Sequence, residues 1–483
     1  MAPFVRRGLR RIVAGVASVA ALATCAPASP RGAGPAPAVP AARGAPPASG
    51  PRTITYDVTY DPATMRLTVD ARFPPGTGLL AVEPGAERWL QGLVVPAGEA
   101  GAVHARADGR VAVECAGGCG VRYGYAVGEA GRALRDLDVA YTAGAMVIAP
   151  ASSWLLAPVG APEDTSALYT VRARAPATFV SGLAPDPGGE RRSATLAHLR
   201  RAPYSAFGEL DVVPVRAEDT ELTLALPRGA PAPPRADLVA WVERSARAVR
   251  AALGVFPARH AALLVLPVPG DDVEVGFSMA GSSIVLRVGR DTPRSALERD
   301  WVLTHEMLHF ACPSQPVARD WAEEGMATYV EPFARARAGL ITREEAWSGL
   351  VRGFHFGQPQ AGDEGLDLTR TWGRVYWGGA LFYFVADYTL RVRTAGKKTL
   401  FDALAAIVAD GGTNAATWPL ERVFAIGDAA TGATVLNELL LAHGARPTRF
   451  DYEAALADLG VQRRGEVVVL DPRAPRAALA RAW

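Results

Sequence analysis

This chain of 483 residues has almost no net charge and few long apolar segments. Its 51 basic and 49 acidic residues leave a net charge of +2, and four arginines fall within residues 6–11. Such a balance provides no basic surface for nucleic acid, so we expect no nucleic-acid partner. The apolar run of residues 12–23 near the N-terminus is too short to span a bilayer comfortably as a helix.

Cysteine is also rare, with four in the chain. Cys115 and Cys119 enclose Ala-Gly-Gly, a flexible loop that could close a small disulfide in an oxidising compartment. A structural zinc site at the same pair is the alternative, although it lacks a second ligand pair nearby. Cys312 stands alone, and we expect a small buried hydrophobic residue there.

The N-terminal segment has the organisation of an export signal. The arginines of residues 6–11 precede the apolar run, which leads into Leu-Ala-Thr-Cys ending at Cys25. This tetrapeptide resembles a bacterial lipobox, in which the cysteine is lipidated and becomes the mature N-terminus. The resemblance implies a cell-envelope lipoprotein anchored to a membrane through Cys25, on the periplasmic side or the cell surface. Ordinary cleavage near Ala23 or Ala26, followed by secretion, is the alternative.

Composition and periodicity divide the chain into five segments. Alternating β-branched and aromatic residues, as in 53–60, predict antiparallel strands, and helical periodicity begins at Arg235. Runs rich in Ala, Pro and Gly cannot form a core and predict a flexible tether. We predict a multidomain α+β fold with these segments: a signal peptide of 1–25, a tether of 26–51, an antiparallel, β-sandwich-like domain of 52–226, a catalytic domain of 227–400 and a mainly helical region of 401–483.

Two histidines and a glutamate have the spacing HExxH in His305-Glu306-Met307-Leu308-His309. On a helix, predicted here over 295–311, residues four apart lie one turn above each other, so both imidazoles can bind one zinc ion. Glu306 can then accept a proton from a zinc-bound water, whose pKa the metal lowers. The alternative is a helix with two unrelated histidines. The apolar residues around the motif favour a buried site, where these polar groups need partners.

A third ligand is expected downstream, because a catalytic zinc usually takes three protein ligands and leaves one position open. The segment Trp321-Ala322-Glu323-Glu324-Gly325 follows His309 after a loop long enough to reach a second helix. Its W-x-x-E-G pattern resembles the second zinc-binding segment of gluzincin peptidases, which implies that Glu324 is the third ligand. Glu323 is the alternative. A metzincin would need a third histidine shortly after His309, and the next one is His355.

A further segment extends the resemblance. Tyr376-Trp377-Gly378-Gly379-Ala380-Leu381 is similar to the stretch that opens with a catalytic tyrosine in glycyl aminopeptidases and aminopeptidase N-like enzymes. The resemblance implies a thermolysin-like zincin catalytic domain behind an N-terminal β domain. It also implies that the Tyr376 hydroxyl stabilises the oxyanion of a tetrahedral intermediate. The pair Gly378-Gly379 departs from the lysine-glycine of these families. A tyrosine packed in the core is the alternative.

The related aminopeptidases carry a glutamate on an edge strand, where it pairs with the α-ammonium of the substrate. The corresponding stretch here includes Gly276, Met279, Ala280 and Gly281, and Met279 falls where the glutamate would be. A methionine offers no charge to an ammonium group, although the strand can still pair with an extended substrate. We therefore predict cleavage of internal bonds or of peptides with blocked N-termini. Capture of the N-terminus by a nearby acid is the alternative, the candidates being Asp271, Asp272 and Glu274.

Together these segments predict zinc-dependent hydrolysis of peptide bonds in the bacterial cell envelope, with Zn²⁺ as cofactor and a peptide or protein as substrate. Glu306 would act as general base and later as proton donor, with Tyr376 assisting at the oxyanion. A non-catalytic zinc-binding envelope lipoprotein is the rival hypothesis, although a structural site does not need the base Glu306. Hydrolysis of another kind of bond is a further alternative. The sequence sets neither the identity of the substrate nor the oligomeric state.

Overall fold

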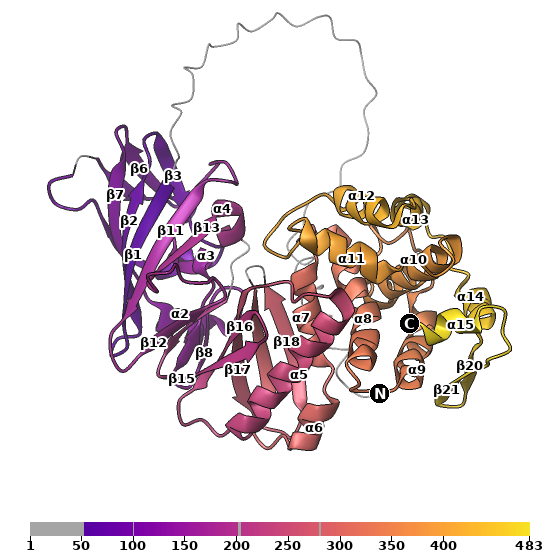
Figure 1. Ribbon diagram of the computed structural model, residues 1–483. Coiled ribbons are helices and arrows are strands. Elements are labelled where there is room, and N and C mark those ends of the chain that lie inside the picture. Colours follow the sequence, from indigo (N-terminus) through magenta and orange to yellow (C-terminus); the bar gives the residue numbers. More distant parts are fainter. Residues whose placement is uncertain (1–52, 100, 201–203, 280–281) are drawn as a thin grey trace, which may run out of the picture. The chain divides into compact units, whose positions relative to one another are not determined.

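The computed structural model describes residues 53–99, 101–200, 204–279 and 282–483 (Figure 1). The predicted signal and tether, with Cys25, lie outside the described residues, as do Ala280 and Gly281. Residues 53–483 cluster as one unit by their internal contacts. No helix among the described residues is both long and apolar enough to cross a membrane.

The first part of this unit is rich in short strands. In β1 (Thr53–Asp61), Ile54, Tyr56 and Val58 are buried at alternate positions, as the period of a strand requires. The elements that follow are β2 (Arg66–Phe73), β3 (Thr77–Ala81), β4 (Leu90–Val94), β5 (Val103–Ala105), β6 (Val111–Cys115), β7 (Cys119–Tyr125), α2 (Val127–Leu134), β8 (Tyr141–Ala143), β9 (Met146–Ile148), α3 (Ala151–Trp154), β10 (Ala157–Pro158), β11 (Ser166–Ala173), β12 (Thr178–Ser181), β13 (Arg191–Thr195), α4 (Leu196–Arg200) and β14 (Ser205–Gly208).

Three sheets make up this part, with strand orders β13-β11-β1-β2-β7-β4, β10-β3-β6-β5 and β12-β14-β9-β8. The prediction of a wholly antiparallel domain is wrong in one respect, because β1 pairs parallel with β11 and antiparallel with β2. A parallel pair joins strands distant in the sequence, so local alternation carries no sign of it. Cys115, at the end of β6, and Cys119, at the start of β7, are joined in a disulfide.

A five-stranded sheet follows and supports the metal-binding segments. Its elements are β15 (Leu210–Ala217), β16 (Thr220–Pro227), α5 (Arg235–Leu253), β17 (His260–Val268), β18 (Val273–Met279) and β19 (Ser283–Gly289). The strand order is β15-β16-β17-β19-β18, in which β16, β17 and β19 run parallel and β18 forms an antiparallel edge. The predicted domain boundary between residues 226 and 227 is therefore wrong, because β15 and β16 belong to this sheet. The connection from β16 through α5 to β17 is a crossover that parallel pairing requires.

Both faces of the five-stranded sheet are covered. Along β17, Leu263 and Val265 belong to the buried cluster that includes α5 and the metal-binding helices. Ala262 and Leu264 alternate with them and join a second cluster, together with Met146 of β9 and Ala206 of β14. Figure 1 shows α5 lying across one face of the strands. Burial on both faces explains why β17 is almost continuously apolar.

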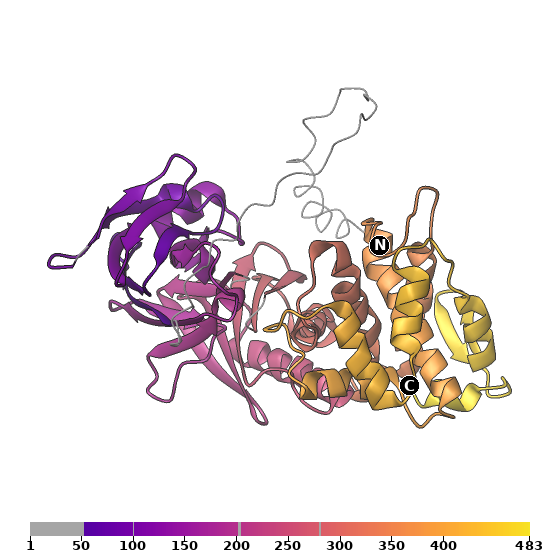
Figure 2. The same cartoon turned by 90° about the horizontal axis from the view of Figure 1, so that it is seen from above.

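Helices form most of the remaining chain, and Figure 2 shows them gathered together, in salmon to yellow, with the small sheet of β20 and β21 beside them. They are α6 (Arg294–Arg299), α7 (Val302–Leu308), η2 (His309–Ala311), η3 (Val317–Arg319), α8 (Asp320–Arg337), α9 (Arg343–Gly353), η4 (Phe354–Gly357), the π-helix η5 (Gly373–Gly378), α10 (Gly379–Arg393), α11 (Leu400–Ala409), α12 (Leu420–Thr431), α13 (Val435–His443), α14 (Tyr452–Leu459) and α15 (Ala477–Arg481); the strands are β20 (Val461–Arg464) and β21 (Val467–Leu470).

The single helix predicted over 295–311 is wrong, because the segment is broken into α6, α7 and η2. Asp300 lies at the break with an extended backbone, and its carboxylate accepts hydrogen bonds from the N–H groups of Val302 and Leu303. These bonds satisfy two of the unpaired donors at the start of α7. The break therefore starts a new helix close to the HExxH motif.

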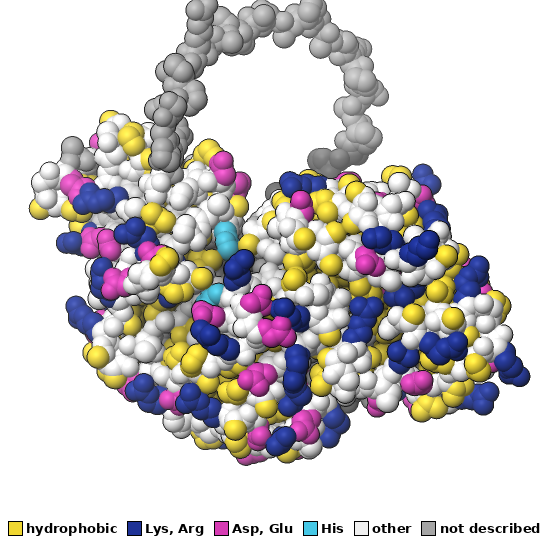
Figure 3. All heavy atoms as spheres, in the orientation of Figure 1, with side chains coloured by type: hydrophobic (Ala, Val, Ile, Leu, Met, Phe, Trp, Pro, Cys, Tyr) yellow, Lys and Arg dark blue, Asp and Glu magenta, His cyan; other side chains and the backbone are white. Residues whose placement is uncertain are grey.

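On the face of the molecule that Figure 3 shows, basic and acidic side chains lie interspersed, as the near-neutral composition leads one to expect. Several arginines of the described chain take part in ion pairs with neighbouring acids, such as Nε of Arg250 with Oε2 of Glu218 at 2.6 Å. Exposed pairs of this kind contribute little to stability.

Helices α8 and α10 cross at two glycines. A Cβ at Gly325 would overlap the backbone of Gly379, and a Cβ at Gly379 would overlap the backbone oxygen of Trp321. The two helices therefore touch through their backbones, which any larger residue at either position would separate. This crossing follows Glu324 directly and lies just after η5.

The substitution Gly325→Ala is expected to lower the free energy of unfolding by about 1–3 kcal/mol, the usual cost of overpacking a close contact. Chemical denaturation of the purified protein measures the change. The matched control is Gly349→Ala in α9, where a Cβ would meet no described atom within 4 Å. That variant should be neutral or up to about 1 kcal/mol more stable, because alanine favours a helix. Equal effects at the two positions would contradict the crossing.

Candidate metal centre

The structure brings together the three predicted metal ligands, His305, His309 and Glu324, whose ligand atoms all lie within 4.8 Å of one another. Oε2 of Glu324 lies 3.3 Å from Nε2 of His305 and 3.6 Å from Nε2 of His309. His305 comes from α7, His309 begins η2, and Glu324 comes from α8. Two imidazoles and one carboxylate are a donor set typical of catalytic zinc, so these residues could hold a zinc ion.

The helix α7 is fixed at its N-terminus by Asp300. Besides the two backbone N–H groups of α7, this carboxylate accepts a hydrogen bond of 2.8 Å from Nε1 of Trp241 in α5. Burial raises the pKa of Asp300, while these hydrogen bonds act in the opposite direction. Because α5 packs on the sheet, the contact ties the first histidine to the sheet itself.

The charges of the three ligands depend on one another. Burial alone would raise the pKa of Glu324, but the two histidines and the hydroxyl of Tyr376 lower it below its usual value. Burial lowers the pKa of His309. For His305 burial also acts downward, but the hydrogen bond and the charge of Glu324 outweigh it and raise the pKa. The ionised carboxylate and the neutral His309 have the protonation states that metal ligands need.

Glu323, the alternative third ligand, has a different partner. Its carboxylate accepts a hydrogen bond of 2.5 Å from the backbone N–H of Gln315, in the loop between η2 and η3. Glu323 therefore holds this loop against α8, while Glu324 faces the histidines.

Glu306 contacts the edge strand β18 closely. Oγ of Ser278 lies 2.7 Å from Oε2 of Glu306 and 2.7 Å from its backbone oxygen, so the hydroxyl can donate to either. A Cβ at Gly276 would overlap Cγ of Glu306 and lie 3.0 Å from its Cδ. The predicted edge-strand glycine is thus the position that leaves room for the Glu306 side chain. The negative charge of Glu306 acts to raise the pKa of both His305 and His309, which indicates that its carboxylate lies beside the predicted metal ligands.

Tyr376 lies in η5, and its hydroxyl forms a hydrogen bond with the carboxylate of Glu324. The negative charge of Glu324 and burial raise the pKa of Tyr376 well above its usual value, so the phenol is neutral and remains a donor. A tyrosine packed in the core, the alternative, would not reach a metal ligand.

The edge strand carries Met279 but turns it away from the predicted metal ligands. Met279 and Phe277 pack against the buried cluster on the sheet face opposite the helices, whereas Gly276 and Ser278 contact Glu306. Glu274 forms an ion pair of 2.9 Å with Arg287 of β19. Arg287 alternates along β19 with Leu286 and Val288 of the helix-side cluster, so this acid lies on the opposite face from Glu306. Asp271 and Asp272 precede the strand, at the end remote from Met279.

Sequence reasoning missed three residues around the ligands. Ser278 donates a hydrogen bond to Glu306, as described above. Ser278 follows Gly276 by two residues, so the strand period places both on the same face of the sheet, and this could have indicated Ser278. Trp301 is 52% exposed, and its ring contacts that of His305 edge-on with centroids 5.7 Å apart. Asp320 lies one turn before Glu324 and forms an ion pair of 3.2 Å with Arg370; burial raises the pKa of Asp320 to about 6. Trp301 and Asp320 each precede a predicted ligand by four residues, and residues four apart are neighbours on a helix surface. This spacing could have indicated both residues.

The purified protein is expected to carry about one zinc per chain, as a three-ligand site implies. His305→Ala should lose most of this zinc, because it removes one of three ligands. The matched control is His355→Ala, which changes an exposed histidine outside the group. Elemental analysis, with circular dichroism as a check of folding, measures the difference. Full zinc occupancy in folded His305→Ala would show that the metal lies elsewhere.

No protein-family model and no curated protein matches the sequence. Among solved structures, an aminopeptidase N family protein from Idiomarina loihiensis is similar over 85% of this chain and 78% of its own, with a TM-score of 0.65 and 17% identity. An M1 zinc metallopeptidase from Deinococcus radiodurans is similar over 83% and 95%, with a TM-score of 0.53 and 16% identity. A variant of that enzyme bound to a Tyr-Ser-Ala substrate gives 0.54 and 15% over the same shares. At these identities the likeness is one of fold, and the fold of this chain is that of the aminopeptidase N-like, M1 zinc metallopeptidases.

Proposed function

We propose that this protein is a zinc-dependent peptidase with a thermolysin-like catalytic domain. The observation that carries the proposal is the convergence of a carboxylate, Glu306, and a neutral phenol, Tyr376, on the group of His305, His309 and Glu324. A metal site that serves only structure needs neither a base nor a hydrogen-bond donor beside its ligands. The rival hypothesis of a non-catalytic zinc-binding protein leaves both unexplained.

The chemistry follows from these positions. Zinc, when bound, would polarise the carbonyl of the scissile bond and lower the pKa of a water molecule. Glu306, held by Ser278, accepts the proton of the attacking water and passes it to the leaving amine. Tyr376, neutral because its pKa is raised, donates a hydrogen bond to the developing oxyanion. The edge strand β18 offers backbone groups to an extended peptide.

A peptide is the proposed substrate, and the likeness to an M1 zinc metallopeptidase bound to a Tyr-Ser-Ala substrate supports this choice. We further propose that the protein accepts internal bonds or blocked N-termini. Met279 offers no charge, and Glu274 is paired with Arg287 on the opposite sheet face. These two findings leave the edge strand without an acid beside Glu306.

The proposed place of action is the bacterial cell envelope. The support is the export-type N-terminal segment and the lipobox-like end at Cys25. Finding the protein in the membrane fraction, and its release by Cys25→Ser, would agree with this location. A wild-type protein that is wholly soluble, with an N-terminus other than Cys25, would contradict it.

Glu306→Gln is expected to reduce peptide hydrolysis by about a hundredfold or more while the zinc content stays unchanged, because only the proton acceptor is lost. The measurement pairs kcat/KM on a peptide library with elemental analysis of the same preparation. Unchanged turnover would remove Glu306 from the mechanism.

A second variant tests the position of the same carboxylate. Gly276→Ala leaves every ligand in place but introduces a methyl group where the Glu306 side chain lies. It should also lower kcat with little loss of zinc. Gly349→Ala, which changes a helix surface, is its control.

One peptide offered with a free and with an acetylated N-terminus is expected to be cut at similar rates at an internal bond. The physical reason is that the acid of the edge strand, Glu274, is paired with Arg287 on the opposite sheet face and so is not placed to pair with the α-ammonium. Mass spectrometry of the products identifies the bond that is cut. Stepwise cleavage of the free form alone would mean that another acid, such as Asp320, captures the ammonium.

A further inference from the structure

The π-helix η5 presents Tyr376 on one side and is anchored on the other. Arg374 precedes Tyr376 by two residues, and residues two apart on a helical turn point to roughly opposite sides. The side chains of Arg374 and Asp363 are each 2% exposed, and Nε of Arg374 lies 2.7 Å from Oδ2 of Asp363. Its Nη1 also donates to the backbone oxygen of Gly357. The anchor therefore joins η5 to the loop after η4.

A buried ion pair of this kind gives little net stability. Removing two charges from water is costly, and apolar residues of similar size often stabilise a core equally well. Burial lowers the pKa of Arg374, and the charge of Asp363 opposes that change. What Arg374 adds is a fixed orientation, because its planar guanidinium donates from Nη1 to the backbone oxygen of Gly357 while the ion pair with Asp363 holds its charge in place.

The residues around the pair leave space for it. A Cβ at Gly378 would lie 3.1 Å from Nη1 of Arg374, so the glycine makes room for the guanidinium. A Cβ at Gly357 would overlap the backbone of Trp377. The related families have a lysine where this chain has Gly378. In this chain the Arg374 side chain lies against that position.

The direction of Tyr376 depends on η5 remaining a π-helix. A π-turn contains one more residue than an α-turn, and one residue of an α-helix corresponds to a rotation of about 100°. If η5 relaxed to an α-helix, Tyr376 would rotate relative to α10 and lose its hydrogen bond to Glu324. Isolated π-turns are rare and need support from their surroundings.

We propose that the buried pair of Arg374 and Asp363 holds η5 in its π conformation and thereby aims the Tyr376 hydroxyl at the metal centre. Arg374 is then a positioning residue that acts through Tyr376. The inference rests on the proposed function, since the aim of Tyr376 matters for catalysis only if the site hydrolyses a substrate.

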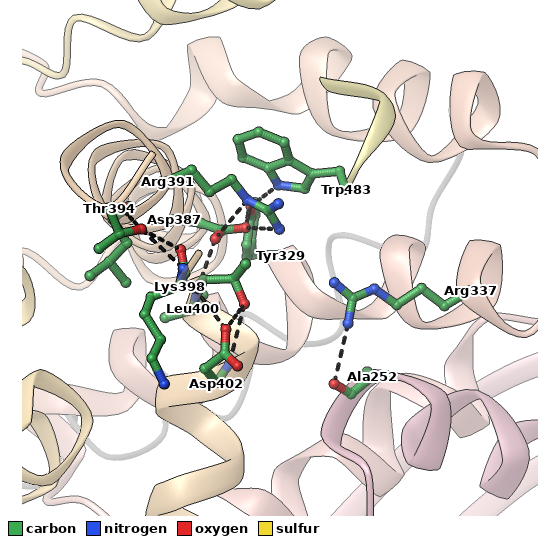
Figure 4. Close-up of polar contacts among 12 residues, drawn as sticks. Ala252, Tyr329, Arg337, Asp387, Arg391, Thr394, Lys398, Leu400, Asp402 and Trp483 are labelled. Atoms are coloured by element: carbon green, nitrogen blue, oxygen red, sulfur yellow. Dashed lines mark hydrogen bonds and ion pairs between the residues drawn. The ribbon is translucent and has the colours of Figure 1, made fainter. Parts of the chain in front are cut away.

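The chain offers a matched control in a second buried arginine–aspartate pair, shown in Figure 4. In α10, Nε of Arg391 lies 3.1 Å from Oδ1 of Asp387, and the two side chains are 2% and 0% exposed. Asp387 also accepts hydrogen bonds from Tyr329 and from the backbone N–H of Leu400. This pair lies about three helical turns beyond Tyr376, so it is a buried ion pair of the same residue types without the contact to η5.

The test is a double-mutant cycle on peptide hydrolysis. Arg374→Met is expected to lower kcat at least about tenfold, towards the about hundredfold loss expected for Tyr376→Phe, with the zinc content unchanged. In the Tyr376→Phe background Arg374→Met should cause little further loss, because the hydroxyl that it positions is already gone. Arg391→Met is expected to lower the melting temperature, with the same small effect on kcat in both backgrounds.

The outcomes separate the two proposals. Equal losses from Arg374→Met with and without the Tyr376 hydroxyl would overturn the positioning role, as would an unchanged kcat. If Tyr376→Phe alone left kcat unchanged, the role of Tyr376 would be wrong and the inference would fall with it. Should Arg374→Met not fold, Asp363→Asn is measured in the same cycle with the same expectations. Arg374→Lys should restore charge but not direction, so kcat should stay low.

Discussion

The backbone contact between Gly325 and Gly379 is the constraint on which the candidate site depends. Glu324 directly precedes the first glycine, and Tyr376 lies three residues before the second. Two helices that meet through their backbones can bring such neighbours together, whereas larger side chains at the crossing would keep the helices further apart. The hydrogen bond between Tyr376 and Glu324 is a direct result of this short separation.

The sheet fixes the other half of the site. Its strand β17 is buried on both faces, and α5 packs on one of them. Trp241 of α5 donates a hydrogen bond to Asp300, the residue whose carboxylate caps the start of α7. The edge strand β18 then meets Glu306 through Gly276 and Ser278. The loop between α11 and α12 completes this arrangement, because Nδ2 of Asn414 donates a hydrogen bond of 3.0 Å to the backbone oxygen of Met279. The groups around the metal ligands thus come from three parts of the chain that are far apart in sequence.

Sequence patterns predicted the residues whose chemistry is local. HExxH is readable because two ligands four residues apart share a helix face, and the segment around Glu324 has a recognisable pattern of its own. Three features were not readable from the sequence, because each depends on contacts between distant segments. They are the break at Asp300, the parallel pairing of β1 with β11 and the membership of β16 in the five-stranded sheet. The same holds for Arg374, whose partner Asp363 precedes it in an irregular loop. Periodicity reports which side of an element is buried but not what lies against it.

The half-exposed indole of Trp301 gives the metal centre an optical property. Its ring lies edge-on to the imidazole of His305, whereas Trp154, Trp241, Trp321 and Trp347 are fully buried in apolar clusters. Protonation of that imidazole, or its coordination to a metal, changes the electric field and the quenching group beside a fluorophore that water can also reach. The contribution of Trp301 to the intrinsic fluorescence would therefore change with the state of His305, without any attached label.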